Sequence, residues 1–156
     1  MDTVLVTGGA GFIGSHIADG FLAAGYSVAV VDTLRTGRRE NVPAGARLYE
    51  VDIRDASAIH DVVAREKPVI ISHQAALADV RESMSHPREY AEVNILGTLN
   101  LLEAARANGA RKMVFASTGG AIYGQPDPLP ATEQTEARPL DLYGVTKLSA
   151  ELYLES

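Results

Sequence analysis

The chain has 156 residues, 46% of them hydrophobic, which is enough for one domain with a single sizeable core and too few for two ordinary domains. Its formal net charge is −6, with no long run of either sign, which argues against a surface that binds nucleic acid or an anionic membrane. There is no cysteine, so disulfide frameworks, thiolate zinc sites and cysteine nucleophiles are excluded.

The first residues contain neither a basic segment nor a long apolar one. Met1 is followed almost at once by Val4, and no apolar stretch approaches the roughly 18 residues of a membrane span. We therefore expect no export signal and no membrane partner. Together with the lack of cysteine, this predicts a cytoplasmic protein.

Short apolar runs alternate with helical patterns along the chain. The runs are rich in β-branched residues, are bounded by Gly, Asp or Pro, and predict five strands, at Val4–Thr7, Ser27–Val31, Arg47–Val51, Val69–Ser72 and Met113–Ser117. Helical spacing predicts helices at Gly11–Ala24, Ala56–Arg65 and Arg88–Asn108, and a last one from Asp141 or Leu142. This alternation implies right-handed βαβ units and a doubly wound α/β fold, with a parallel sheet covered on both faces.

The stretch from Gly124 to Pro139 is predicted to be a loop. It carries Pro126, Pro128, Pro130 and Pro139 among polar residues, and proline interrupts both helices and sheet ladders. The loop is either a plain surface connection or, because it ends just before Tyr143, the rim of an active site.

A glycine-rich turn follows the first predicted strand. It reads either as Gly9-x-Gly11-x-x-Gly14 or as Gly8-x-x-Gly11-x-x-Gly14, and both patterns place glycine where a backbone can approach a pyrophosphate closely. The helix that begins near Gly11 would point its N–H groups and its dipole at that anion. The turn therefore predicts dinucleotide binding.

Asp32, at the end of the second predicted strand, indicates which dinucleotide binds. A carboxylate there can accept hydrogen bonds from both ribose hydroxyls of an adenosine and would repel a 2′-phosphate, which favours NAD over NADP. Arg35, Arg38 and Arg39 keep NADP open as an alternative, because guanidinium groups near the ribose could hold a phosphate.

Two further groups of residues have ordinary structural interpretations. Asp52, which we expect to close the third strand, is either an adenine contact or a helix cap or turn residue. The four histidines have no ligand-like spacing, so no metal site is expected, and His73 at a strand end is predicted to be structural.

Tyr143 and Lys147 lie four residues apart, on one face of the last predicted helix. The alternative interpretation is a core aromatic residue beside a solvated charge. A lysine ammonium in this arrangement can stabilise a phenolate, so with the glycine turn the pair points to redox chemistry on a nicotinamide cofactor.

The ordered motifs resemble those of the extended short-chain dehydrogenases/reductases, specifically the NAD-dependent epimerase/dehydratase family and its UDP-hexose 4-epimerases. The matching motifs are Thr7 to Ser15, Asp32 to Gly37, His73 to Ala76, Asn94, Ser117 to Gly124, and Tyr143 with Lys147. The resemblance implies a Rossmann-type sheet of about five strands in the order 3-2-1-4-5. It also implies NAD as cofactor, a UDP-hexose as substrate and a possible homodimer.

The resemblance also implies site residues. Those implied to contact the cofactor are Gly8, Gly11, Phe12, Ile13, Gly14, Asp32, Asp52, Ile53, Gln74, Ala75, Ala76, Asn94, Ser117, Tyr143 and Lys147. The implied catalytic set is Thr118, Tyr143 and Lys147. Tyr143 would act as the base at the sugar 4-hydroxyl, with its pKa lowered from about 10 by Lys147 and the nicotinamide charge. A transient 4-keto sugar would then take the hydride back on its other face.

Two departures from the family pattern limit this transfer. Many epimerases carry serine where this chain has Gly119, so the hydroxyl here comes from Thr118, and some have lysine where this chain has Ala78. Related dehydratases use an Asp-Glu pair after the threonine. Gly119 and Gly120 cannot perform that elimination, which disfavours dehydratase activity.

The chain ends at Ser156, nine residues after Lys147, whereas members of the resembled family are roughly twice as long. We therefore expect residues 1–156 to be one NAD-binding domain without the substrate domain, with apolar surface exposed at Leu148, Leu152 and Leu154. Three possibilities stay open: the first half of a 4-epimerase that binds NAD without full turnover, a non-catalytic NAD-binding or sensing module, or a small oxidoreductase completed by a partner.

Overall fold

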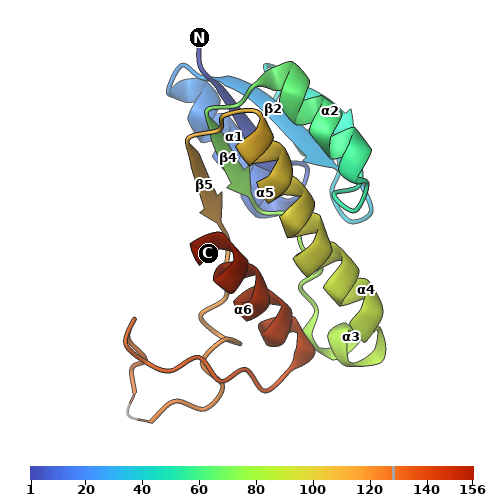
Figure 1. The fold of residues 1–156 in the computed structure, drawn as a ribbon. Coiled ribbons are helices and arrows are strands. Elements are labelled where there is room, and N and C mark those ends of the chain that lie inside the picture. The colour runs from blue at the N-terminus through green and yellow to red at the C-terminus, as the bar shows by residue number, and fades with distance from the viewer. Residues whose placement is uncertain (128) are drawn as a thin grey trace. The chain divides into compact units, whose positions relative to one another are not determined.

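The computed structural model describes residues 1–127 and 129–156 (Figure 1). Pro128, one of the four prolines of the predicted loop, lies outside the described residues. The chain forms two compact units. The sheet unit comprises Met1–Ala76 and Asn100–Ala116, and the helical unit comprises Leu77–Leu99 and Ser117–Ser156.

The sheet unit contains a five-stranded parallel sheet. Its strands are β1 (Thr3–Thr7), β2 (Ser27–Asp32), β3 (Arg47–Glu50), β4 (Ile70–His73) and β5 (Lys112–Phe115). Their spatial order is β3-β2-β1-β4-β5, and every neighbouring pair is parallel. The predicted fold class and strand order are thus confirmed.

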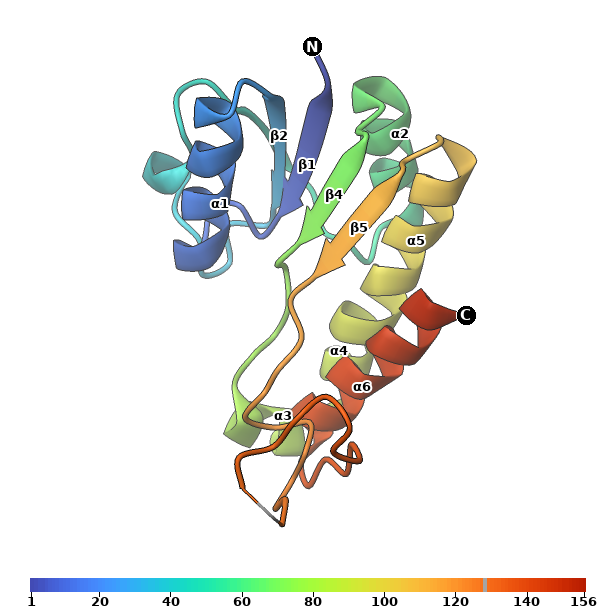
Figure 2. The same ribbon diagram turned by 90° about the vertical axis from the view of Figure 1, so that its left-hand side faces the viewer.

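Helices cover both faces of this sheet, as Figure 2 shows: α1 (Phe12–Ala23) lies on one face, and α2 (Ala56–Glu66) and the part of α5 (Gly97–Ala107) from Asn100 onward lie on the other. Strands buried on two sides require continuous apolar runs rather than alternation. The four valines Val4, Val6, Val28 and Val30 are accordingly fully buried and pack with Ala18 of α1.

The helical unit contains α3 (Val80–Ser85), α4 (Pro87–Ala91), a π-helical turn η2 (Glu92–Leu96), the first residues of α5, and α6 (Leu142–Glu155). Tyr90 of α4 is fully buried. Its hydroxyl accepts a hydrogen bond from the Asp79 N–H at 3.1 Å and lies 3.0 Å from the Glu82 carboxylate. This aromatic residue therefore anchors α3 to α4.

The predicted elements are confirmed to within about two residues at their ends, and three features differ. The sequence missed α3 and the short 3-10 turn η1 (Arg39–Asn41), because six and three residues are too few to show a period. It also predicted one uniform helix from Arg88 to Asn108, where the structure has α4, the π-helical turn and α5. Between Gly124 and Pro139 the described residues form neither helix nor strand, as expected.

The expected apolar exposure on α6 is only partly correct. Leu152 is 59% exposed, but Leu148 and Leu154 are half-buried because α6 packs against α3, α4 and the π-helical turn. In the described part of the chain, no helix has the length and apolar character needed to cross a membrane.

Gly14 of α1 lies where no side chain fits. A Cβ there would lie 2.2 Å from the Gly8 carbonyl oxygen, so Gly14→Ala must push α1 away from the strand that precedes it. We expect this variant to lose about 2–3 kcal/mol of unfolding free energy in urea titration.

Gly20→Ala provides the matched control on the same helix, because apart from its chain neighbours and the backbone of the helix itself no described atom lies within 4 Å of the added Cβ. This variant should gain about 0.5–1 kcal/mol, since alanine restricts the unfolded chain and favours the helix. Equal effects of the two substitutions would contradict the tight docking of α1.

Candidate functional site

The glycine turn packs directly against the loop that follows β4. Gly8 has φ +69°, and a Cβ on it would lie 2.8 Å from the backbone nitrogen of Ala75. Only glycine allows both this conformation and this approach. The predicted cofactor residues Gly8, Gln74 and Ala75 therefore lie together at the carboxyl ends of β1 and β4.

Thr7, which sequence reasoning did not single out, fixes this arrangement. Its hydroxyl oxygen accepts hydrogen bonds from the N–H groups of Gln74 and Ala75, both at 3.2 Å, and lies 2.7 Å from Nδ1 of buried His73. This contact fits the structural role predicted for His73. A hydroxyl that ends an apolar strand just before a glycine turn is the signal that could have found Thr7.

The start of α1 has the character of an anion site. Its N-cap residue is Gly11, and no side chain caps it, whereas α2, α3 and α6 are capped by Asp55, Asp79 and Asp141. The first N–H groups of a helix have no partner within the helix, so an uncapped start offers them to a ligand. Phe12 and Ile13, on this first turn, are 80% and 63% exposed.

Asp32 ends β2, as predicted, and joins two loops. One of its carboxylate oxygens accepts a hydrogen bond from Ala10 N–H at 3.0 Å, and the other accepts from Leu34 N–H at 2.8 Å. Each oxygen has two lone pairs, so both can still accept ribose hydroxyls. Of the nearby arginines, Arg39 is already paired with Glu50 at 2.6 Å.

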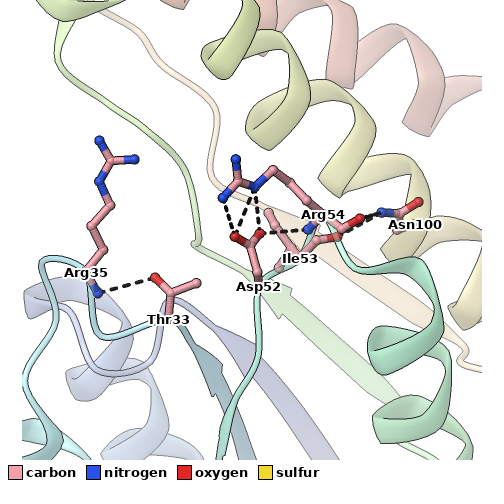
Figure 3. Close-up of polar contacts among 6 residues, drawn as sticks. All are labelled: Thr33, Arg35, Asp52, Ile53, Arg54 and Asn100. Atoms are coloured by element: carbon pink, nitrogen blue, oxygen red, sulfur yellow. Dashed lines mark hydrogen bonds and ion pairs between the residues drawn. The ribbon is translucent and has the colours of Figure 1, made fainter.

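Asp52 does not close β3, which ends two residues earlier at Glu50. Its carboxylate accepts hydrogen bonds from the backbone N–H and the guanidinium of Arg54 (Figure 3). These bonds hold the pKa of Asp52 below its usual range, against the opposing effect of burial, and the charge of Arg35 lowers it further. The cap of α2 is Asp55, so of its two structural interpretations Asp52 fits the turn residue.

In the helical unit, two side chains hold the start of α6. Asp141 accepts a hydrogen bond from the Gly144 N–H at 2.7 Å, and the hydroxyl of buried Ser83 accepts one from the Tyr143 N–H at 3.1 Å. Ser83 belongs to α3, the helix that the sequence did not reveal. It therefore positions Tyr143 from an element that sequence reasoning missed.

Within the protein, the surroundings of Tyr143 act against the lowering of its pKa that was expected from Lys147 and the nicotinamide charge. Burial raises this pKa, and a hydrogen bond with the Thr118 side chain only partly opposes the rise. Lys147 is 3% exposed, and burial lowers its pKa to about 8, with Glu151 acting in the other direction. Lys147 is thus a buried amine, not a solvated charge.

Asn94 is engaged within the protein. Its side-chain amide donates to Leu77 O at 2.9 Å and to the Thr146 hydroxyl at 3.0 Å, while its oxygen accepts from Leu77 N–H at 2.9 Å. It was predicted as a cofactor contact. The contacts within the protein tie the π-helical turn to α6, one residue before Lys147, and the cofactor contact stays a prediction.

The predicted residues thus fall into two groups. The sheet unit holds Gly8 to Gly14, Asp32, Asp52, Ile53 and Gln74 to Ala76, and the helical unit holds Asn94, Ser117, Thr118, Tyr143 and Lys147. Ser117 is exposed and Thr118 half-buried. Among residues 1–127 and 129–156, no group of three or more His, Cys, Asp or Glu side chains is placed to hold a metal ion.

The sequence of the chain is similar to those of known proteins. The family model described as "NAD dependent epimerase/dehydratase family" matches residues 4–156. The UDP-glucose 4-epimerase of Corynebacterium glutamicum is 42% identical over 153 residues, which are 98% of this chain and 46% of the relative.

Solved structures of UDP-glucose 4-epimerases have a similar fold. The Thermus thermophilus UDP-glucose 4-epimerase in complex with NAD matches with a TM-score of 0.95 and 51% identity, over 98% of this chain and 50% of that one. The Thermotoga maritima UDP-glucose 4-epimerase with UDP-glucose matches with a TM-score of 0.96 and 43% identity, over the same shares. The chain spans about half the length of these relatives. It belongs to the NAD-dependent epimerase/dehydratase family.

Proposed function

We propose that this chain is the NAD-binding half of a UDP-hexose 4-epimerase, and that residues 1–156 act as its cofactor domain. The observation that carries the proposal is the uncapped start of α1 beside a glycine turn, with Asp32 at the end of the neighbouring strand. Relatives named UDP-glucose 4-epimerase, one of them in complex with NAD and another with UDP-glucose, support the cofactor and a nucleotide-sugar substrate.

The residues of the sheet unit suit NAD. The N–H groups of Phe12 and Ile13 at the start of α1 would bind the pyrophosphate, and Gly8, Gly11 and Gly14 keep the turn that presents them tight. Asp32 would accept the ribose hydroxyls, and Asp52 with Ile53 would meet the adenine. Gln74, Ala75 and Ala76 would line the cofactor from the loop that Thr7 fixes.

The helical unit would supply the acid–base chemistry. When bound, NAD accepts a hydride from the sugar and returns it. Tyr143 would take the proton of the 4-hydroxyl, and Thr118, hydrogen-bonded to Tyr143, would orient the reacting oxygen. Since burial raises the Tyr143 pKa, its deprotonation requires a nearby positive charge, which Lys147 and the nicotinamide would provide.

The half length of the chain sets its proposed role. Because relatives are about twice as long, we propose that this chain alone binds NAD without full turnover. Homodimerisation and a cytoplasmic location remain further proposals.

Removal of the Asp32 carboxylate should weaken NAD binding selectively. In calorimetric titration, Asp32→Ala should raise the Kd for NAD at least ten-fold, because hydrogen bonds to a charged group contribute about 1.5–3 kcal/mol each. The parent chain should bind NAD more tightly than NADP. Asp19→Ala, which removes an exposed carboxylate on α1, is the matched control and should bind NAD like the parent. NAD binding unchanged in Asp32→Ala would contradict the ribose assignment.

The buried Lys147 predicts a pH dependence of stability. Its pKa of about 8 in the folded chain lies below the ordinary value of 10.5, so above pH 8 the unfolded chain binds more protons than the folded one. Stability should therefore rise with pH, by about 1–2 kcal/mol between pH 7.5 and 9.5 in urea titration. The pH range stops at 9.5 because Tyr90 and Tyr143 have raised pKa values in the folded chain. Above their ordinary pKa of 10, these two groups make stability fall as the pH rises.

Two variants check this assignment. Lys147→Met should abolish the rise, whereas Lys112→Met, which removes an exposed lysine on β5, should retain it. If the pH profiles of the parent and Lys147→Met coincide, the amine is not titrating as described.

A further inference from the structure

Arg54 dominates the surroundings of the Asp52 carboxylate, as Figure 3 shows. The Arg54 backbone N–H donates to Oδ1 at 2.9 Å, Nε donates to Oδ2 at 2.9 Å, and Nη2 donates to Oδ2 at 2.6 Å. Nε also lies 3.1 Å from Oδ1. A carboxylate has about four acceptor positions, so one residue occupies nearly all of them.

The backbone beside this ion pair is fixed independently of it. Asn100 of α5 donates its side-chain amide to the carbonyl oxygens of Ile53 and Arg54, at 2.9 and 3.1 Å. Ile53 itself is buried. The Arg54 side chain, which is 41% exposed, can therefore rotate away from Asp52 without moving the backbone that carries both residues.

Charge keeps Asp52 an acceptor. Arg54 and, from the loop after β2, Arg35 both favour the ionised carboxylate, so at neutral pH Asp52 has no proton to donate. A ligand group that replaces Arg54 must therefore be a donor. The exocyclic amino group of adenine is such a donor, whereas the carbonyl oxygen at the same place in hypoxanthine is not.

We propose that Arg54 is a specificity-determining residue at the adenine end of the site, where it competes with the adenine amino group for Asp52. This inference rests on the proposed function, in which Asp52 meets adenine. A displaced guanidinium would also donate to a hypoxanthine oxygen. Arg54 thus weakens the binding of NAD, favours its hypoxanthine analogue and narrows the discrimination between the two bases.

The size of the effect follows from the exposure of the pair. Partly exposed ion pairs contribute at most about 1 kcal/mol, so removing the competition from Arg54 should raise the affinity for NAD by up to roughly five-fold. Losing the contact from Arg54 to the hypoxanthine oxygen should lower the affinity for the analogue by a similar factor. The two dinucleotides carry the same charge. The ratio of their dissociation constants therefore cancels long-range attraction to the arginines.

The test is calorimetric titration with NAD and with nicotinamide hypoxanthine dinucleotide. The ratio of Kd for the hypoxanthine dinucleotide to Kd for NAD should rise about three- to ten-fold in Arg54→Met. It should rise less in Arg54→Lys, which keeps the charge and loses the paired contacts, and it should fall in Asp52→Ala. Arg138→Met is the matched control, because Arg138 also pairs with a carboxylate two residues earlier, that of Glu136. The ratio of the two dissociation constants in this variant should equal that of the parent chain.

The outcomes separate this inference from the proposed function. A parent chain that binds neither dinucleotide contradicts both. A parent that binds NAD, with a ratio that is unchanged or lower in folded Arg54→Met, overturns the role of Arg54 alone. A ratio that rises equally in Arg138→Met also overturns it.

Discussion

The contact between the glycine turn and its neighbours is the constraint on which the rest of the sheet unit depends. Gly8 approaches Ala75, and Gly14 approaches Gly8, at distances that leave no room for a side chain. Because the turn is this tight, α1 begins directly at the end of β1, with its N–H groups uncapped. Asp32 then accepts a hydrogen bond from the Ala10 N–H of the turn, and Thr7 accepts one from the Ala75 N–H of the loop that packs against it. Asp32, the proposed ribose contact, therefore also holds the turn in shape.

A different constraint organises the helical unit. Lys147 is a buried amine, and burial raises the pKa of Tyr143, one helical turn earlier. Burial opposes the charged forms of both groups, so it raises the pKa of Tyr143 and lowers that of Lys147. Ser83, Asp141 and Asn94 fix the helix that carries them. A bound cation beside Tyr143 would shift this balance toward the phenolate, which is the state that a proton acceptor needs.

The sequence predicted features that have strong local signals. Continuous apolar runs identified the five strands, the glycine spacing located the turn, and Asp32 was correctly placed at the end of β2. It could not reveal Ser83, and it did not single out Thr7, because their roles depend on hydrogen bonds to residues far away in the chain. It also missed that Arg54 occupies Asp52, because no periodic pattern indicates a contact between residues two apart, and it missed that burial raises the Tyr143 pKa. The roles of the site residues themselves remain predictions.

Complementation can test whether this chain is one half of a 4-epimerase. The chain would be produced together with the second half of the Corynebacterium glutamicum relative, and conversion of UDP-galactose to UDP-glucose would be followed. We expect turnover only when both halves are present, and its loss in Tyr143→Phe. Two results would contradict this proposal. One is turnover by the chain alone. The other is a complex that binds NAD but gives no turnover, although its second half is active when paired with its own first half.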